Sequence, residues 1–449
     1  MARAKKEAAL TPEERLQAAL VPDWEWPYKL PGNWCWTYLT KAAECLDNFR
    51  KPINATERAG RNGNVPYYGA TGQVGWIDDF LTDEDLVLLG EDGAPFLDLI
   101  KDKAYLITGK AWVNNHAHIL RSLFGDTGNR YLLHYLNSFN YAGYVNGTTR
   151  LKLTRASMDT IPIPLPPLAE QQRIVDRIES LFAKLDEAKE KAQAVVDSFE
   201  TRKAAILHKA FTGELTAKWR EEHGVGMESW KKKRLSDVVT EFKYGTSEKS
   251  DYNNKGIPVL RIPNIGDNGI DLSDIKYLNH RNVDSESQIH EGDILIIRSN
   301  GSRDLVGKAV LVPELGCEYA YASFLIRAKP NHSIINAHYL TIFLNSTDAR
   351  GQMFRRAKSS AGINNINTKE LGAISLTVPS LPEQDEIVHI INEMMDKDQQ
   401  SKEAAEVALD QIDLMKKSIL ARAFRGELGT NDTSEESAVE LLKEIIRRG

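Results

Sequence analysis

Three groups of residues near the start of the chain have side chains that could do chemistry. Residues 64–67 (Asn-Val-Pro-Tyr) differ by one proline from the Asn-Pro-Pro-Tyr motif of adenine methyltransferases, and no glycine-rich cofactor loop precedes them. Asp98 with residues 101–103 (Lys-Asp-Lys) offers the carboxylates and amines that nucleases use, but a solvated turn is the preferred interpretation. His116 and His118 point to the same side of an extended strand and could ligate a metal, although no third ligand is evident. For the histidines we prefer contact with a base or with backbone, or plain packing.

The chain also lacks a nucleotide-binding phosphate loop. No segment follows the pattern G-x-x-x-x-G-K-[ST]. Lys110 and Lys308 each follow a glycine, but the earlier glycine and the Ser or Thr are missing. We therefore predict no catalytic residues, no metal site and no cofactor in this chain.

The composition is that of an ordinary soluble protein, with 449 residues, 42% of them hydrophobic and 27% charged. A chain of this length holds two or three domains. No apolar run approaches the roughly 20 residues that span a membrane, and the basic N-terminus lacks the apolar segment of a signal peptide. The three cysteines have neither metal-binding spacing nor a disulfide framework, so we expect a reducing, cytoplasmic setting.

Charge is unevenly distributed along the chain. The formal net charge of −6 argues weakly against nucleic-acid binding by the chain as a whole, but the distribution matters more than the sum. Basic residues cluster at 231–234, at Arg298 with Arg303, and at 355–358. Each cluster taken alone is interpreted as solvated charge.

The elements that must position these side chains are organised around a repeat. Residues 166–215 align without a gap with residues 379–428, at a constant offset of 213 (383 − 170 for the first glutamates). A match of this length indicates two half-molecules in tandem, each ending in a long helix. Proline precedes each helix, and a Glu-Gln pair lies in its first turn, where the helix dipole favours acid. Gly213 and Gly426 are the predicted stop signals.

Apolar residues in both repeats recur at alternating steps of three and four, which is typical of a coiled coil. The first seam consists of Ile174, Ile178, Leu181, Leu185, Ala188, Ala192, Val195, Phe199, Ile206 and Ala210. The second consists of Ile387, Ile391, Met394, Ala405, Ala408, Ile412, Met415, Ile419 and Ala423. The first seam skips a step at Arg202 and Lys203, and Asp398 and Ser401 interrupt the second. A helix of about 40 residues is roughly 60 Å long, so we predict two paired rods; two ordinary core helices are the alternative.

Short β-like runs separated by glycine turns precede each repeat. In the first half we expect strands at 65–68, 75–77, 85–89, 105–108 and 111–113, and a helix at 130–137. In the second half the strands at 257–261 and 292–297 and the helix at 339–344 follow the same plan, with different loops at 298–302 and 361–366. One scaffold with two sets of loops is the organisation expected of a protein that recognises two different targets at a fixed distance.

Short segments flank these two halves. Thr11 is the predicted N-cap of a helix over 12–20, and an aromatic strip follows at 24–28. The tail contains an amphipathic helix at 439–446 whose apolar face needs a partner, in this chain or in another.

The order of two divergent β-rich domains, each followed by such a helix, resembles the specificity (S) subunit of Type I restriction-modification enzymes. The residues that carry the resemblance are 166–171 with 210–215 and 381–384 with 423–428. Residues 68–72, 90–93 and 114–118 also resemble stretches of this family. The resemblance covers nearly the whole chain, and its helical repeats are more specific than its domain stretches.

The resemblance implies an α+β fold. Two tandem β-rich target recognition domains would be joined by two long helices that form an antiparallel coiled coil, in a pseudo-two-fold internal repeat. The implied segments are an N-terminal extension (1–30), target recognition domain 1 (31–164), conserved helical region 1 (165–218), target recognition domain 2 (219–378), conserved helical region 2 (379–428) and a C-terminal tail helix (429–449).

The resemblance also implies partners. Each target recognition domain would read one half of a bipartite asymmetric site in double-stranded DNA, and the helices would set the spacer and bind two modification (methyltransferase) subunits. Restriction subunits would join through these. S-adenosylmethionine is expected on the modification subunits, ATP and Mg²⁺ on the restriction subunits, and no membrane partner is expected. The weak seam at Asp398 and Ser401 is a candidate contact for a partner subunit or for solvent.

A DNA-reading domain needs donors and acceptors on loops that enter a groove. Arginine suits guanine and asparagine suits adenine, whereas lysine and backbone amides suit phosphates. In domain 1 the candidate DNA-binding residues are Tyr68, Thr71, Asn114, Asn115, His116, His118, Thr148, Thr149 and Arg150. In domain 2 they are Arg261, Asn264, Arg298, Asn300, Ser302, Arg303, Ser360, Asn364 and Asn365.

Two other hypotheses compete with DNA recognition. A non-catalytic coiled-coil scaffold would bind two protein partners through its globular domains. A stand-alone nuclease or methyltransferase would show activity from this chain alone.

Overall fold

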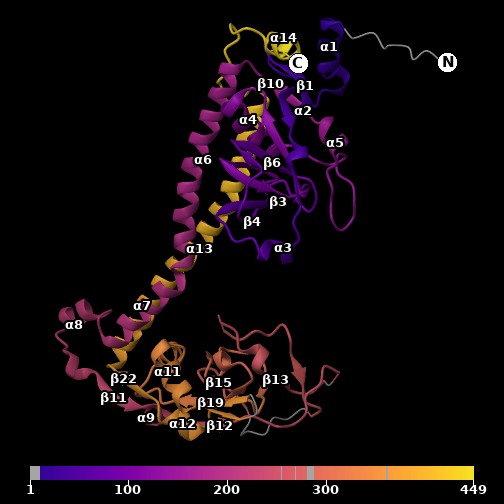
Figure 1. Ribbon diagram of the computed structural model, residues 1–449. Coiled ribbons are helices and arrows are strands. Elements are labelled where there is room, and N and C mark those ends of the chain that lie inside the picture. Colours follow the sequence, from indigo (N-terminus) through magenta and orange to yellow (C-terminus); the bar gives the residue numbers. More distant parts are fainter. Residues whose placement is uncertain (1–10, 254, 268, 281–287, 361–362, 449) are drawn as a thin grey trace. The chain divides into compact units, whose positions relative to one another are not determined.

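The computed structural model (Figure 1) describes residues 11–253, 255–267, 269–280, 288–360 and 363–448 and contains both helices and sheets. It has two compact units. Unit 1 contains the chain up to Gln193 together with the segment from Glu406 onward, and unit 2 is Ala194–Ala405. These units divide the chain inside the long helices, so each one contains a β-rich domain and parts of both helical repeats.

Two four-stranded sheets form the β-rich part of unit 1. The strands of the first sheet, all antiparallel and in pairing order, are β2 (Ala43–Cys45), β9 (Ala117–Ser122), β6 (Leu86–Gly90) and β7 (Ala104–Ile107). Those of the second are β4 (Gly72–Ile77), β3 (Val65–Gly69), β8 (Lys110–Val113) and β5 (Thr82–Asp83), in which β3 and β8 run parallel. The strands predicted in this half are confirmed, whereas β9, a central and largely buried strand, was not predicted.

Unit 2 repeats this topology. Its four-stranded antiparallel sheet consists, in pairing order, of β12 (Val239–Tyr244), β19 (Leu325–Pro330), β15 (Ile294–Ile297) and β17 (Ala309–Leu311). A three-stranded sheet follows the order β14 (Lys276–Tyr277), β13 (Pro258–Leu260) and β18 (Ala320–Tyr321), and β13 and β18 are again parallel. The first sheets match strand for strand, and the second sheets match in three strands, with no counterpart of β5 among the described residues of the three-stranded sheet, which confirms the internal repeat that the sequence predicts.

A short strand pair closes each domain. β1 (Cys35–Tyr38) pairs with β10 (Pro162–Leu165), and β11 (Lys231–Arg234) pairs with β22 (Ser375–Val378), both antiparallel. The amide of Leu39 donates to Ile161 O at 2.9 Å in unit 1, and that of Leu235 donates to Ile374 O at 2.8 Å in unit 2. The chain therefore enters and leaves each domain at the same place, directly before the long helix.

One helix of each domain is fixed to its sheet by an asparagine. Asn137, near the end of α4 (Gly125–Ser138), bonds the backbone N and O of Ala104 at 2.8 and 3.0 Å. Asn345, at the end of α10 (Ala337–Leu344), bonds the N and O of Ala309 at 3.0 and 2.8 Å. These helices confirm the predictions at 130–137 and 339–344.

The flanking segments pack on unit 1. Thr11 caps α1 (Pro12–Ala19), as the sequence predicts, and it forms a reciprocal capping box with Glu14, which was not predicted. The tail helix α14 (Ala438–Arg448) lies beside α1 (Figure 1) and buries Leu442 in a cluster with Ala19. Its apolar face therefore contacts this chain. In the aromatic strip only Tyr28 packs well, edge-on to Trp36 at 5.0 Å, whereas Trp24 is 81% exposed.

The repeats form α6 (Leu168–Asp197) and α7 (Phe199–Thr212) in the first half and α13 (Leu381–Phe424) in the second. The break at Ser198 was not predicted, but helical bonds continue across it: the Ser198 amide donates to Ala194 O at 3.1 Å and the Arg202 amide to Ser198 O at 2.9 Å. Gly213 and Gly426 have φ of 83° and 73°, which confirms both stop signals.

Within each unit the helices pair antiparallel. In unit 1, Ile174 and Ile178 at the start of α6 share a core with Phe424 at the end of α13. In unit 2, Leu207 in the last turns of α7 shares a core with Ile387 in the first turns of α13. This confirms the predicted pairing.

Three predicted seam residues are wrong. Ala188 is exposed, Met394 is 39% exposed and Met415 is 46% exposed. Two helices alone bury only a narrow stripe, so a side chain at the edge of the stripe stays in water unless a β-rich domain also covers it.

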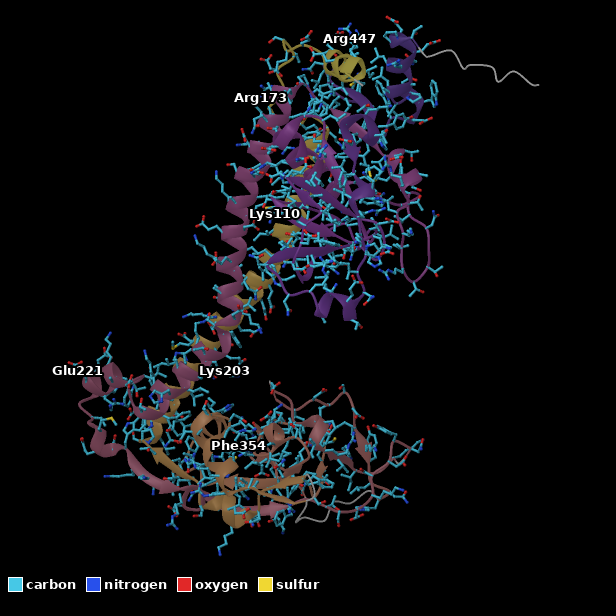
Figure 2. The ribbon with its side chains drawn as sticks, in the orientation of Figure 1. Lys110, Arg173, Lys203, Glu221, Phe354 and Arg447 are labelled. Atoms are coloured by element: carbon cyan, nitrogen blue, oxygen red, sulfur yellow. The ribbon has the colours of Figure 1, made fainter. Side chains whose placement is uncertain are left out.

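A buried glutamate fixes the start of α6. The Glu170 side chain is fully buried and accepts hydrogen bonds from Thr430 Oγ1 at 2.7 Å and from Arg173 Nη2 at 2.9 Å. Arg173, labelled in Figure 2, also bonds Glu435 at 2.8 Å. Burial raises the pKa of Glu170, although Thr430 and Arg173 act in the opposite direction. The acid in this first turn is therefore a tertiary contact and not simply a partner of the helix dipole.

The equivalent glutamate, Glu383, fixes the start of α13 in unit 2. Its side chain is also fully buried and accepts from Thr216 Oγ1 at 2.8 Å, from Arg220 Nη1 at 2.5 Å and from Trp230 Nε1 at 3.1 Å. Thr216 directly follows the Glu-Leu that ends the first repeat, and Thr430 lies two residues beyond the Glu-Leu that ends the second. Each helix start is thus bonded to the segment that follows the other repeat, and we call these two contacts the glutamate locks.

Removing a glutamate lock should destabilise the unit that contains it. Glu383→Ala leaves the largely buried Arg220 without its carboxylate, and breaking a buried ion pair in this way lowers the free energy of unfolding by roughly 3–5 kcal/mol. Urea denaturation of the purified chain measures the loss. Glu403→Ala, at an exposed position of the same helix, is the matched control and should change stability by less than about 0.5 kcal/mol. Equal effects of the two variants would contradict a structural role for Glu383.

The domain–helix contact of unit 1 should be sensitive to acid through His134. This α4 residue packs edge-on to Phe182 at 5.9 Å, and burial lowers its pKa from 6.5 to about 4. Because the unfolded chain takes up this proton first, stability should fall as the pH drops from 6.5 towards 4, by about 3 kcal/mol in all. His134→Phe should remove that part of the pH dependence of the unfolding free energy. His208→Phe, at an exposed site on α7, should leave it unchanged; a wild-type pH profile for His134→Phe would contradict the assignment.

Candidate nucleic-acid interface

Four loops of domain 1 meet at one place. The Asn114 amide donates to Tyr68 O at 3.1 Å, and the Glu91 amide donates to His116 O at 2.7 Å. Gly90 passes so close to the β3–β4 turn that a Cβ there would lie 3.0 Å from Ala70 O. The Gly93 amide donates to Leu151 O at 3.0 Å. The structure thus brings together the loops that carry the predicted DNA-binding residues of this domain.

Asp92 is the centre of this loop cluster. Its carboxylate accepts from Arg150 Nη2 at 2.8 Å and lies 2.6 Å from His116 Nδ1. The Arg150 side chain is 60% exposed and that of His116 is 38% exposed, so both present donors to solvent. The sequence prediction missed Asp92 because it considered only groups that contact DNA directly, and an acid that holds such groups in place has no separate signal.

A second acid, Glu91, extends the cluster. It pairs with Arg50 and with Lys152 Nζ at 3.0 Å, neither of which was predicted. Burial raises the pKa of Glu91, but the two cations outweigh this and lower it. The cluster therefore combines two carboxylates with Arg50, Lys152 and Arg150. Arg50 is largely buried, whereas the exposed side chains of Lys152 and Arg150 can meet an anionic backbone.

The prediction for His118 is wrong. Its ring is 1% exposed; Nδ1 lies 2.7 Å from Asp47 Oδ2 and Nε2 lies 3.0 Å from Leu153 O. The two ring nitrogens are therefore held by Asp47 on one side and by the Leu153 carbonyl on the other. Although burial acts in the opposite direction, His118 and the Ile119 amide lower the pKa of Asp47. This group holds β9 in place and cannot reach DNA.

Cys45 lies next to this pair. Its Sγ and the ligand atoms of Asp47 and His118 lie within 4.8 Å of one another, so the structure supplies further candidate metal ligands that the sequence did not reveal. Burial, reinforced by Asp47, raises the pKa of Cys45 to about 12. In the described chain these three side chains form a hydrogen-bonded cluster, in which the thiol bonds Asp47.

The other domain 1 predictions divide into exposed and supporting residues. Asn114 is only 8% exposed, and its Oδ1 accepts from the His116 amide at 2.8 Å, so it shapes the loop. Tyr68 is half-buried and packs at 5.8 Å from Tyr105. The residues that stand exposed at the cluster are Thr71, Asn115, Thr148, Thr149 and Arg150.

In domain 2 a small sheet brings the predicted loops together. Its strands, in pairing order, are β16 (Ser299–Asn300), β21 (Ile363–Asn365) and β20 (Lys358–Ser360). The Arg298 guanidinium lies 4.4 Å over the Tyr244 ring, and its Nη2 donates to Asn365 Oδ1 at 3.3 Å. A stacked guanidinium with one amide partner is held in a defined orientation.

The neighbouring residues complete this small sheet. Asn300 Oδ1 accepts from the Ser302 amide at 2.7 Å, and Asn364 Nδ2 donates to Gly301 O at 3.3 Å. Arg303 lies 5.1 Å from the ring of Phe354, which Figure 2 labels. Ser360 ends β20, but its side chain, like residues 361 and 362, is outside the described part of the chain.

The remaining two predictions lie in a separate loop. Asn264 is 1% exposed and bonds the carbonyls of Asp271 and Asp274 at 2.8 and 2.9 Å, so its predicted DNA contact is wrong. Arg261 pairs with Asp274 at 3.0 Å and lies 5.9 Å from the Tyr252 ring. Both residues shape the loop after β13.

The groups first singled out for catalysis have structural roles. Tyr67 of the near-miss motif is 1% exposed in β3, and its hydroxyl bonds the Ile53 amide at 3.2 Å. Asp98 accepts from the amides of Ile100 and Lys101 at 3.0 and 3.3 Å, which confirms the interpretation as a turn. None of the helices in the described ranges is both long and apolar enough to cross a membrane.

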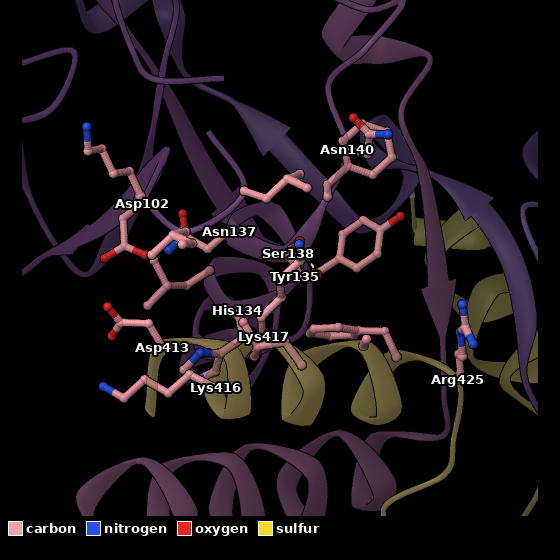
Figure 3. Close-up of a pocket in the computed structure, with 18 of the residues that line it drawn as sticks. Asp102, His134, Tyr135, Asn137, Ser138, Asn140, Asp413, Lys416, Lys417 and Arg425 are labelled. Carbon is pink, nitrogen blue, oxygen red and sulfur yellow. Dashed lines mark hydrogen bonds between the residues drawn. The ribbon is translucent and has the colours of Figure 1, made fainter. Parts of the chain in front are cut away.

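Unit 1 also contains a cleft of about 820 Å³ between α4, residues 99–102 and the helix pair (Figure 3). Lys416 and Lys417 enter it from α13, and Lys189 pairs there with Asp413 at 2.7 Å. His134 lines it from the other side as a neutral ring, because burial lowers its pKa to about 4. The lining combines apolar side chains with the cations Lys101, Lys189, Lys416, Lys417 and Arg425 and the carboxylates Asp102 and Asp413.

Comparison with known proteins agrees with this geometry. The profile of the Type I restriction modification DNA specificity domain matches residues 46–196 and 227–407. The chain is 30% identical over 332 residues to the EcoKI specificity subunit of Escherichia coli strain K12 and 28% identical over 335 residues to the StySPI specificity subunit of Salmonella potsdam, with 70% of each chain covered in both cases.

Two solved structures share the fold. The HsdS subunit from Thermoanaerobacter tengcongensis matches with a TM-score of 0.59 at 19% identity, over 90% of this chain and 99% of that one. A structure described as the basis of complex assembly and conformational transition of the type I R-M system matches with a TM-score of 0.62 at 19% identity, over 90% and 100%. Since the profile matches both halves and more than half of the whole sequence, the chain belongs to the family of Type I restriction-modification DNA specificity subunits.

Proposed function

We propose that each β-rich domain of this specificity subunit reads one half of a bipartite asymmetric DNA site. The family assignment makes the chain the DNA-recognition component of a Type I system and not a catalytic one. The observation that carries the division into two readers is the matching order of the four-stranded antiparallel sheets in the two domains, combined with unlike loop clusters. In this proposal the shared four-stranded sheet gives both domains a common scaffold, and the different side chains of the two clusters select different bases.

The two clusters offer different recognition chemistry. Domain 1 presents Arg150 and His116 on the carboxylate of Asp92, with the exposed Asn115 beside them. Domain 2 presents Arg298 on Tyr244, next to Asn365. Arginine can bind guanine O6 and N7 together, and asparagine can bind adenine in the same manner. In this proposal the exposed cations around them contact phosphates and set the orientation.

The helix pair would set the spacer and receive the partner subunits. The antiparallel seams and the glutamate locks support a rod of fixed register. The cationic, half-apolar cleft of unit 1 is the candidate docking place for one modification subunit, and the internal repeat supports a second such place in unit 2. Restriction subunits would join through the modification subunits. S-adenosylmethionine would belong to the modification subunits, ATP and Mg²⁺ to the restriction subunits, and the assembly would work on DNA in the cytoplasm.

Replacing one domain tests the proposal directly. Residues 31–164 would be exchanged for the corresponding domain of another family member, in a strain that carries the matching modification subunits. Only one half of the methylated motif should change, because residues 219–378 are untouched; sequencing of methylated adenines across the genome measures this. An unchanged motif would instead support the scaffold hypothesis, in which the domains bind proteins.

Arg298→Ala should weaken discrimination at one base pair of one half-site by about 1–3 kcal/mol, if the guanidinium binds guanine bidentately. Binding of the assembled methyltransferase to duplexes with single base changes measures this at fixed salt. Arg298→Lys keeps the charge but not the planar fork, so it should lose nearly as much. Equal weakening on every sequence would identify Arg298 as a phosphate contact.

A further inference from the structure

The two places where the coiled-coil seam is interrupted meet each other. In unit 2, Arg202 Nε lies 2.5 Å from Asp398 Oδ1, and the Asp398 side chain is only 12% exposed. Arg202 also donates to Val195 O at 3.1 Å and to the Ser198 hydroxyl. Among the described residues, Asp398 Oδ2 and Arg202 Nη2 have no hydrogen-bond partner. The predicted contact of Asp398 with a partner subunit or solvent is therefore replaced by an ion pair within this chain.

The equivalent place in unit 1 is apolar. Adding the repeat offset of 213 to 202 gives Met415, and subtracting it from 398 gives Leu185. The helix pair therefore has two positions that are equivalent in the repeat, one charged and one apolar. Met415 is 46% exposed and Leu185 is half-buried, so unit 1 forms its helix pair without a charge at this position.

The difference matters for the choice of helix partner. Because the repeats are alike, the first repeat of one copy could pair in the same register with the first repeat of a second copy. Arg202 would then face Leu185, and in the matching pair of second repeats Asp398 would face Met415. Asp398, in the more buried position, would lose its counter-ion. Burying a charge without its counter-ion strongly destabilises the pairing of the helices.

In a pair of first repeats the neighbouring ion pairs do not make this distinction. Lys189 pairs with Asp413 at 2.7 Å, and in a pair of first repeats Lys189 would face Glu200 instead (413 − 213). Lys416 pairs with Asp186, and Asp186 would then face Lys203 (416 − 213). Opposite charges still meet in both cases.

The aromatic ends do not distinguish the pairings either. Phe424 packs on Tyr135 at 5.1 Å, and its equivalent Phe211 packs on Tyr339 at 5.4 Å. A phenylalanine would therefore fill the same site in either arrangement.

We propose that the Arg202–Asp398 pair is the specificity determinant that directs the first repeat to the second repeat of the same chain and against a like repeat of another copy. A single polar seam position is known to specify helix pairing at some loss of stability, and rejection of the wrong partner often works through an unpaired charge. The pairing itself does not depend on what the domains bind. Its consequence for DNA rests on the proposed function: like pairing would join two copies of one domain, which would read a symmetric site.

The test compares exchange between copies of the full chain. Two copies with different affinity tags are co-expressed, and the fraction that carries both tags is measured after tandem purification. R202M/D398L gives the charged position the apolar pair of unit 1, and we expect the mixed fraction to rise by about tenfold for each charge that no longer rejects the wrong partner. R202D/D398R keeps a complementary pair and should stay at the wild-type level.

A second variant keeps the test valid if the first variant folds poorly. L185D/M415R places an ion pair at both seam positions, so like repeats would also meet with opposite charges, and the mixed fraction should again rise. A mixed fraction for both designs no higher than that of the wild type would overturn the proposal, as would an equal rise in R202D/D398R. Because no DNA is present, this result is independent of the domain exchange that tests DNA reading.

Discussion

One fully buried carboxylate holds the architecture of each unit together: Glu170 in unit 1 and Glu383 in unit 2. Glu170 and Glu383 are expensive to bury, and they remain stable only while hydroxyl, guanidinium or indole donors surround them. In both units some of those donors come from the segment that follows the opposite repeat. The start of one helix is therefore stable only when the segment that follows the other helix is folded against it. The folding of chain segments that lie far apart in the sequence is coupled in this way.

This coupling explains why the scaffold tolerates less change in sequence than the loops do. The sheets, the paired closing strands and the asparagines that fix α4 and α10 recur with nearly the same bond lengths in both units. The exposed loops take part in none of these contacts. Their side chains are positioned locally, by Asp92 in one domain and by Tyr244 in the other. A substitution in a loop therefore changes the exposed side chains without destabilising the sheets that carry the loop.

Much of the fold could be predicted from the sequence, because a repeat at fixed offset and a three-four seam are patterns of residue type. Single side chains were harder. His118, Asn114 and Asn264 have the polar character of DNA contacts, but they are buried because a strand or a turn needs their hydrogen bonds, and burial depends on partners distant in sequence. The same limit applied to Asp398, whose partner Arg202 was itself visible as a skipped seam step. Asp92 was overlooked for the opposite reason, since its importance lies in the two groups that it holds.

The pairing of β1 with β10 and of β11 with β22 has a consequence for how such chains diversify. Everything between the two strands of a pair forms a module with adjacent ends. Recombination between related genes therefore needs sequence agreement at only two junctions to deliver a complete new module. The long helices, which are alike in the two halves of this chain, supply that agreement on one side of each module.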